Sequence, residues 1–209
     1  MSDVDFFFDP VCPWAWITSR WVTEVASLRK LDVDWKFISL RMVNRGHDYE
    51  SEFPPGHVDT HTLGLKLLRV AGAVREEAGN DGVARLYTAV GTAIHIEKRR
   101  EELNEINAIG KLLRSAGLHE HLREAANETA GDGIIQNETE LALARAGRDI
   151  GTPVITFAPP DGPSFFGPVI SRIPRGDEAL ALWDATERLA MFPGFAELKR
   201  SVREAPQVI

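Results

Sequence analysis

Reactive chemistry in this sequence centres on one cysteine near the N-terminus. Cys12 is the only cysteine among 209 residues, and it lies between Pro10 and Pro13 after the apolar segment 4–8. Pro13 suits the first position of a helix, where a missing N–H costs nothing, so Cys12 is predicted to be the N-cap. A sulfur there faces unpaired N–H groups and the positive end of the helix dipole, which lower a thiol pKa. We therefore expect Cys12 to be a nucleophilic thiolate near neutral pH.

A second interpretation of Cys12 stays open, because a lone cysteine commonly packs as a small apolar side chain. The Cys-Pro pair at a strand-to-helix junction favours the reactive interpretation. A dithiol site attacks with one cysteine and resolves the mixed disulfide with another, but the position three residues after Cys12 holds Ala15. If Cys12 reacts, a thiol from solution must release the adduct.

The elements that must position Cys12 are predicted from the pattern of apolar residues. Segment 4–8 reads as a strand buried on both faces, and residues 16–31 show the spacing of a helix with one buried face. Alternation over 33–40 predicts a second strand that completes a β-α-β unit. Glycines and prolines over 41–57 predict a loop that leaves this unit.

The C-terminal part of the chain returns to strand character. Residues 150–157 predict a strand, and Asp161-Gly162 predicts a hairpin turn to a further strand at 164–166. A helix is predicted to follow Gly176, and a short closing helix over 192–203. Between these parts, residues 58–149 show helical stripes and no convincing strand.

Composition limits the partners. The 24 basic and 31 acidic residues give a net charge of −7, which argues against nucleic acid or an anionic membrane surface as a partner. No apolar run approaches the length of a membrane span, and the first strand leaves no room for a signal peptide. We expect a cytoplasmic protein, either a monomer or a homodimer.

Several motifs together resemble a known family. The chain is similar to the DsbA-like branch of the thioredoxin superfamily with a helical insertion, and within it to the actinobacterial mycothiol-dependent reductases of nitroreductase type. Cys12-Pro13-Trp14-Ala15 resembles the Cys-Pro-Trp-Cys site of that branch with its second cysteine replaced. The other segments that carry the likeness are Asp9-Pro10-Val11, Thr18-Ser19-Arg20-Trp21, Gly151-Thr152-Pro153, Phe166-Gly167-Pro168, Ile173-Pro174-Arg175-Gly176 and Phe195-Ala196-Glu197-Leu198-Lys199-Arg200.

The resemblance implies an α/β fold, with a thioredoxin-like core formed by residues 1–45 and 149–209 and an inserted all-helical subdomain formed by residues 46–148. It also implies that Pro153 follows a cis peptide bond and lies against the Cys12 sulfur. Thr152 would then offer its backbone to an incoming thiol compound.

Three further residues are predicted to contact substrate. Trp14 is expected to be exposed beside the nucleophile, where its ring suits aromatic or sugar-like compounds. His95 is either a residue at the boundary of a helical stripe or, as the resemblance implies, a cleft residue that faces Cys12 and stabilises the thiolate or holds substrate. Asn44 resembles a cleft-facing asparagine of the mycothiol-dependent relatives. Trp16 is expected to pack in the core.

The predicted function is that of a thiol-dependent oxidoreductase with Cys12, Pro13, Trp14 and Ala15 as its catalytic motif. The resemblance implies mycothiol or a similar thiol as cosubstrate, a small electrophile or disulfide as the second substrate, and no bound cofactor. The remaining histidines form no convincing metal set, so no metal is predicted; they are His47, His57, His61, His119 and His121. Two alternatives stay open, a kappa-class-like thiol transferase or isomerase and a catalytically silent binding module.

Overall fold

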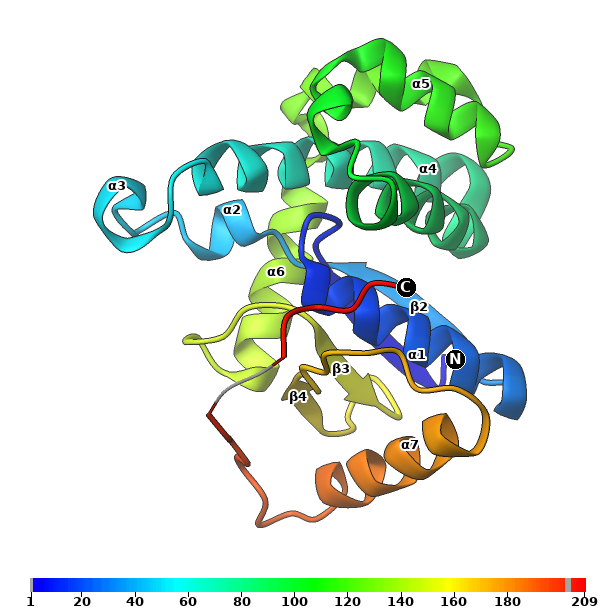
Figure 1. Cartoon of the computed structure of the whole chain (residues 1–209), viewed down its shortest axis with the longest axis vertical. Coiled ribbons are helices and arrows are strands. Elements are labelled where there is room, and N and C mark those ends of the chain that lie inside the picture. The colour runs from blue at the N-terminus through cyan, green and yellow to red at the C-terminus, as the bar shows by residue number, and fades with distance from the viewer. Residues whose placement is uncertain (1, 202–203) are drawn as a thin grey trace.

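A computed structural model describes residues 2–201 and 204–209, and its described strands form one mixed sheet (Figure 1). The order is β2-β1-β3-β4. β1 (Val4–Phe8) pairs in parallel with β2 (Val33–Phe37) and antiparallel with β3 (Val154–Phe157), which pairs antiparallel with β4 (Ser164–Phe166). The predicted β-α-β unit and C-terminal hairpin are therefore confirmed.

Helices cover both faces of the sheet. Successive side chains of β1 point to opposite faces, so each face presents apolar side chains to bury. Phe6 and Phe8 belong to the large apolar core shared with α1 (Pro13–Arg29) and α7 (Gly176–Ala190). Phe7 points the other way, into a small cluster that includes Ala142 of α6 (Asp132–Ala146). All five β1 residues are buried, as the apolar run predicts.

The middle of the chain is helical, and no strand occurs within residues 38–153. Figure 1 places α4 and α5 at one end of the molecule and α7 at the other. The helices between β2 and β3 are α2 (Leu40–Val43), α3 (Tyr49–Glu52), α4 (His57–Gly91), η1 (Thr92–Ile96), η2 (Arg100–Asn104), α5 (Ile106–Ser115), η3 (Glu120–Asn127), η4 (Thr129–Gly131) and α6. The fold is thus the predicted thioredoxin-like sheet with many inserted helices.

The boundaries of the two predicted units stay a prediction. Helix α6 falls within the predicted insertion, yet it bonds to the end of β2. Glu138 accepts a hydrogen bond from the Phe37 N–H at 2.7 Å, and Thr139 accepts one from the Ser39 N–H at 3.0 Å. These bonds satisfy backbone N–H groups at the end of the edge strand β2, so α6 stabilises the sheet as well as the helical region.

Two predicted segments are wrong in detail. Residues 41–57, predicted as a loop, include the short helices α2 and α3, because Ser39 and Asp48 cap their N-termini. Residues 192–201, predicted to begin a closing helix, contain none. Pro193 and Gly194 interrupt the chain there, and Phe192 and Leu198 are 64% and 80% exposed, so little buried apolar surface is available to stabilise a helix. Residues 202–203 lie outside the described part of the chain.

No helix of the described chain is both long enough and apolar enough to cross a lipid bilayer.

The close approach of α4 to α1 gives a test of the packing. A Cβ on Gly91 would lie 2.1 Å from Cζ3 of the buried Trp16 ring. We expect Gly91→Ala to lower the free energy of unfolding by roughly 1–3 kcal/mol, because the ring has no room to move. Gly133→Ala in α6 is the matched control, since no atom lies within 4 Å of its added Cβ. Urea unfolding followed by tryptophan fluorescence measures both variants; equal midpoints would contradict the described packing.

Candidate active site

Cys12 is the N-cap of α1, as predicted. Its backbone is extended, with φ −80° and ψ 115°, and Pro13 occupies the first helical position. The sulfur accepts a hydrogen bond from the Ala15 N–H at 3.5 Å, and the Cys12 carbonyl accepts one from the Trp16 N–H at 3.0 Å. The turn between β1 and α1 therefore aims the thiol at the open backbone donors of the helix.

The segment before β3 closes over the same sulfur. The Cys12 thiol donates to the Thr152 carbonyl at 3.5 Å, across 140 positions of sequence. The Thr152-Pro153 bond is cis, which confirms the predicted isomer. The Thr152 hydroxyl donates to the Phe7 carbonyl of β1 at 3.3 Å, so this segment is fixed to the central strand. Sulfur, helix N-terminus and cis-proline segment thus form one compact site.

The predicted low pKa of Cys12 is wrong for this arrangement. Burial raises the pKa of the Cys12 thiol to about 12, and the nearby Asp9 carboxylate raises it further, whereas the backbone N–H groups of Ala15 and Trp14 lower it. Only 7% of the residue is exposed. Loss of water around a thiolate therefore outweighs the attraction of the helix N-terminus. The thiol holds its proton here, in keeping with its hydrogen bond to Thr152.

Asp9 belongs to the site, although the sequence indicated it only as part of the motif before Cys12. It is fully buried, and its two carboxylate oxygens accept hydrogen bonds from the Val11 N–H at 3.1 Å and the Leu40 N–H at 2.8 Å. Burial raises its pKa to about 7, against the opposing effect of these two donors. The sequence feature that could have indicated this role is the position of Asp9 between an apolar strand and a proline.

Helix α4 leaves room for the Asp9 carboxylate. A Cβ on Gly64 would lie 2.5 Å from Asp9 Oδ1, closer than any real contact, so a side chain there would displace the carboxylate. Asp9 thereby joins the active-site turn, the start of α2 and the first half of α4.

His95 supports the turn that carries Cys12. It lies in the π-helical turn η1, is buried, and donates from Nε2 to the Pro10 carbonyl at 2.9 Å. Its ring stacks on Trp16 with a centroid distance of 5.7 Å. Burial lowers the pKa of His95 to about 4, so the ring is neutral at physiological pH. It supplies no positive charge to a thiolate, which corrects one of the two predicted roles.

The remaining predicted residues divide between the site and its surroundings. Trp16 is buried, as expected, and the Arg20 guanidinium lies 4.4 Å above its ring centroid. Trp14 is half-buried against the core, although the prediction made it exposed. Asn44 caps the C-terminus of α2 and donates from Nδ2 to the Leu40 carbonyl at 2.9 Å, so its amide serves its own helix.

Open space beside the turn is small. A cavity of about 10 Å³, the size of one water molecule, borders Phe8, Pro10 and Tyr87. A much larger groove runs between β4, α7 and the C-terminal segment, and Cys12 does not line it. The reactive sulfur and the large groove therefore lie in different parts of the surface. We assign the active site to the sulfur, because the chemistry requires a nucleophile.

The chain is similar to several known proteins. A family model described as "Rv2466c-like: Mycothiol-dependent nitroreductase Rv2466c" matches residues 11–200. The chain is 29% identical over 206 residues to "Uncharacterized protein Rv2286c" of Mycobacterium tuberculosis, covering 96% of this chain and 82% of that one.

Solved structures share the fold. The chain resembles a probable DsbA oxidoreductase, SCO1869, from Streptomyces coelicolor with a TM-score of 0.59 and 15% identity, covering 98% of this chain and 96% of that chain. It resembles the cytosolic disulfide reductase DsbM from Pseudomonas aeruginosa with a TM-score of 0.55 and 20% identity, covering 90% and 99%. At these identities the likeness shows the thioredoxin-like fold, which confirms the predicted fold class.

The buried Asp9 gives a pH-dependent test of stability. Its pKa in the folded chain is raised from 3.8 to about 7, so the folded state holds a proton that the unfolded state has lost. This contribution to stability is fully present below pH 3.8 and is lost as the pH rises through 7. Relative to Asp9→Asn, the wild type should therefore become less stable from pH 5 to pH 8. Urea unfolding across that range measures the difference; a difference that does not change with pH would contradict the buried carboxyl.

Proposed function

Because the chain belongs to the Rv2466c-like family of mycothiol-dependent nitroreductases, we propose that it uses Cys12 as a single nucleophile and mycothiol as the thiol that completes each turnover. Family membership confirms the predicted class, a thiol-disulfide oxidoreductase with a thioredoxin-like fold. The single-thiol mechanism and its cosubstrate are the proposed part.

One observation carries the proposal. The Cys12 sulfur meets the Ala15 backbone N–H where a dithiol site has its second cysteine, and the Ala15 side chain is fully buried and inert. Cys12 is the only cysteine of the chain, so no internal disulfide forms. A thiol from solution must therefore resolve whatever adduct Cys12 makes.

The proposed exchange balances with two small thiols. The Cys12 thiolate attacks the mycothiol sulfur of a mixed disulfide; the Cys12–S–S–mycothiol bond forms, and the other thiolate leaves and takes up a proton. A second mycothiol thiolate then attacks the mycothiol sulfur of the adduct, and the Cys12 thiolate leaves. One mixed disulfide and one thiol become one free thiol and mycothiol disulfide. For a small electrophile, Cys12 and one mycothiol together supply two electrons and end as the same adduct.

The buried thiol requires an activation step. When substrate displaces the Thr152 carbonyl and admits water, the burial that most raises the Cys12 pKa is relieved. The N–H groups of Ala15 and Trp14 remain to stabilise the thiolate. We propose that Trp14, Thr152 and Pro153 line the substrate in that state. Trp14 lies two residues after the nucleophile, and the Thr152 carbonyl, directly before Pro153, accepts the hydrogen bond of the thiol. His95 and Asn44 act through the turn and α2 instead.

The same buried thiol favours a second candidate. A protein with a protonated Cys12 is also suited to hold an incoming thiol that itself attacks the substrate, as in the kappa-class-like transferase or isomerase alternative. In that case Cys12→Ser keeps most of the activity, because a hydroxyl can donate the same hydrogen bond to Thr152. The nucleophile mechanism predicts that Cys12→Ser abolishes turnover.

We propose a cytoplasmic location on the same grounds. A reduced low-molecular-weight thiol pool is the reductant that a single-cysteine site needs, and such pools keep thiols reduced inside cells.

Exposure to mycothiol disulfide tests the single-nucleophile mechanism. We expect intact-protein mass spectrometry to show one mycothiol added per chain, with Cys12 as the modified residue, and free mycothiol to remove it. Cys12→Ser is the control and should gain no mass. An unmodified wild-type chain after prolonged exposure would contradict the mechanism.

Ala15→Cys sharpens the test. A second thiol at that position should resolve the adduct within the chain, because position 15 already contacts the Cys12 sulfur. The variant should therefore lose the added mycothiol and end as an internal disulfide, two mass units lighter than the dithiol, whereas the wild type retains the adduct. An adduct that persists equally in both chains would mean that the sulfur is not placed for exchange with position 15.

A further inference from the structure

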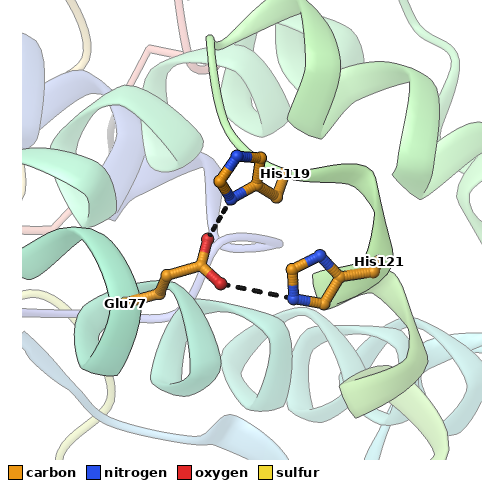
Figure 2. A group of neighbouring side chains, drawn as sticks. All are labelled: Glu77, His119 and His121. Carbon is orange, nitrogen blue, oxygen red and sulfur yellow. Dashed lines mark hydrogen bonds and ion pairs between the residues drawn. The ribbon is translucent and has the colours of Figure 1, made fainter.

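Three ligand-type side chains converge on the surface of the helical region, away from the thiol site. Figure 2 shows the Glu77 carboxylate between the rings of His119 and His121, with one ring nitrogen directed at each oxygen. His119 Nδ1 lies 2.7 Å from Glu77 Oε1, and His121 Nε2 lies 3.2 Å from Glu77 Oε2. The two rings are roughly parallel, with centroids 5.7 Å apart. One donor atom from each residue falls within 4.8 Å of the others.

The backbone of the segment that enters η3 places both histidines beside α4. Leu118 and Leu122 are buried, so they anchor the segment that enters η3, while His119 and His121 point outward between them. Gly117 has a φ of 68°, a left-handed conformation that turns the chain back from α5 toward α4. The arrangement therefore rests on buried contacts of the neighbouring residues rather than on the three exposed side chains themselves.

The partners of the Glu77 carboxylate are the two histidines. Within the described residues it forms no ion pair with arginine or lysine. Glu120, a nearby acidic residue of η3, differs because it forms ion pairs with both Arg114 and Arg123. A carboxylate whose only ion-pair partners are two imidazoles is suited to receive a cation.

The donor set selects the kind of cation. Two imidazole nitrogens and one carboxylate oxygen form a common three-residue zinc set, which leaves a fourth position for water. Hard ions such as Mg²⁺ and Ca²⁺ prefer oxygen donors only. Neighbouring ligands of a tetrahedral zinc ion with bonds of about 2.0 Å lie about 3.3 Å apart. The separation of 3.2 Å at His121 matches this spacing, and that of 2.7 Å at His119 is shorter. All three donor atoms lie within 4.8 Å of one another, so rotations of the exposed side chains must bring them to one ion.

We propose that Glu77, His119 and His121 form a site for a borderline divalent ion of the zinc type, which links α4 to the entry of η3. The bound ion would join two segments that are 42 positions apart in sequence at His119. None of the three side chains contacts Cys12, so the role is structural or regulatory and separate from thiol exchange. This inference revises the sequence prediction that the histidines form no metal set.

Zinc binding to the full chain, freed of any affinity tag, tests the proposal. Calorimetric titration with ZnCl₂ in competition with a chelator of known affinity should show one ion per chain. Cys12→Ser should bind the ion equally, which separates this site from the thiol. In that background, His119→Ala with His121→Ala should weaken binding by at least about 100-fold, since even outer-shell changes cost 10–100-fold.

A matched control is present in the chain. His47 and Glu52 form an exposed imidazole-carboxylate pair with a 2.6 Å separation but with no second histidine on the carboxylate. His47→Ala should leave zinc affinity unchanged. Zinc should also raise the urea midpoint of the wild type and not that of the double variant. No saturable binding, or affinity that survives loss of both histidines, would overturn the assignment and leave a hydrogen-bonded surface cluster only.

Discussion

The contact on which the site depends is the burial of the Cys12 sulfur between the N-terminus of α1 and the carbonyl of Thr152. Each partner comes from a different half of the chain, and β1 lies between them, since it leads into the Cys12 turn and also binds the Thr152 hydroxyl. The same contact that assembles the site removes water from the thiol and so keeps it neutral. A site built this way holds the thiol buried and hydrogen-bonded to the Thr152 carbonyl.

The helical region contributes to this site through backbone contacts rather than through charge. Gly64 of α4 leaves room for the Asp9 carboxylate, and His95 of η1 donates a hydrogen bond to the Pro10 carbonyl. Both contacts stabilise the turn that carries Cys12. Burial shifts the pKa of Asp9 and that of His95 toward the neutral form of each side chain. Neither group favours a thiolate, because His95 is neutral and the Asp9 carboxylate raises the Cys12 pKa; the backbone N–H groups at the helix N-terminus are what lower it.

Most of the fold could be predicted from the sequence because its signals are local. The apolar run of β1, Pro13 after Cys12 and the Asp161-Gly162 turn each fix their own segment. The chemistry of Cys12 depends on distant residues, and the balance between burial and helix dipole could not be judged from the motif. His95 could be placed near the site by resemblance, but only its bond to Pro10 shows that it braces the turn. The closing helix predicted at 192–203 is absent from residues 192–201, because whether a core receives a segment depends on distant residues that the local sequence does not show.

The central claim is that burial holds Cys12 as a protonated thiol until the site opens. The rate of iodoacetamide alkylation of the native chain, followed against pH by mass spectrometry, tests it most directly. The structure predicts a midpoint well above the ordinary thiol value of about 8.5, a slow reaction at pH 7, and a marked rise in rate at that pH when urea unfolds the chain. A native midpoint below about 7.5, in the range of thiolates activated at helix N-termini, would contradict the account.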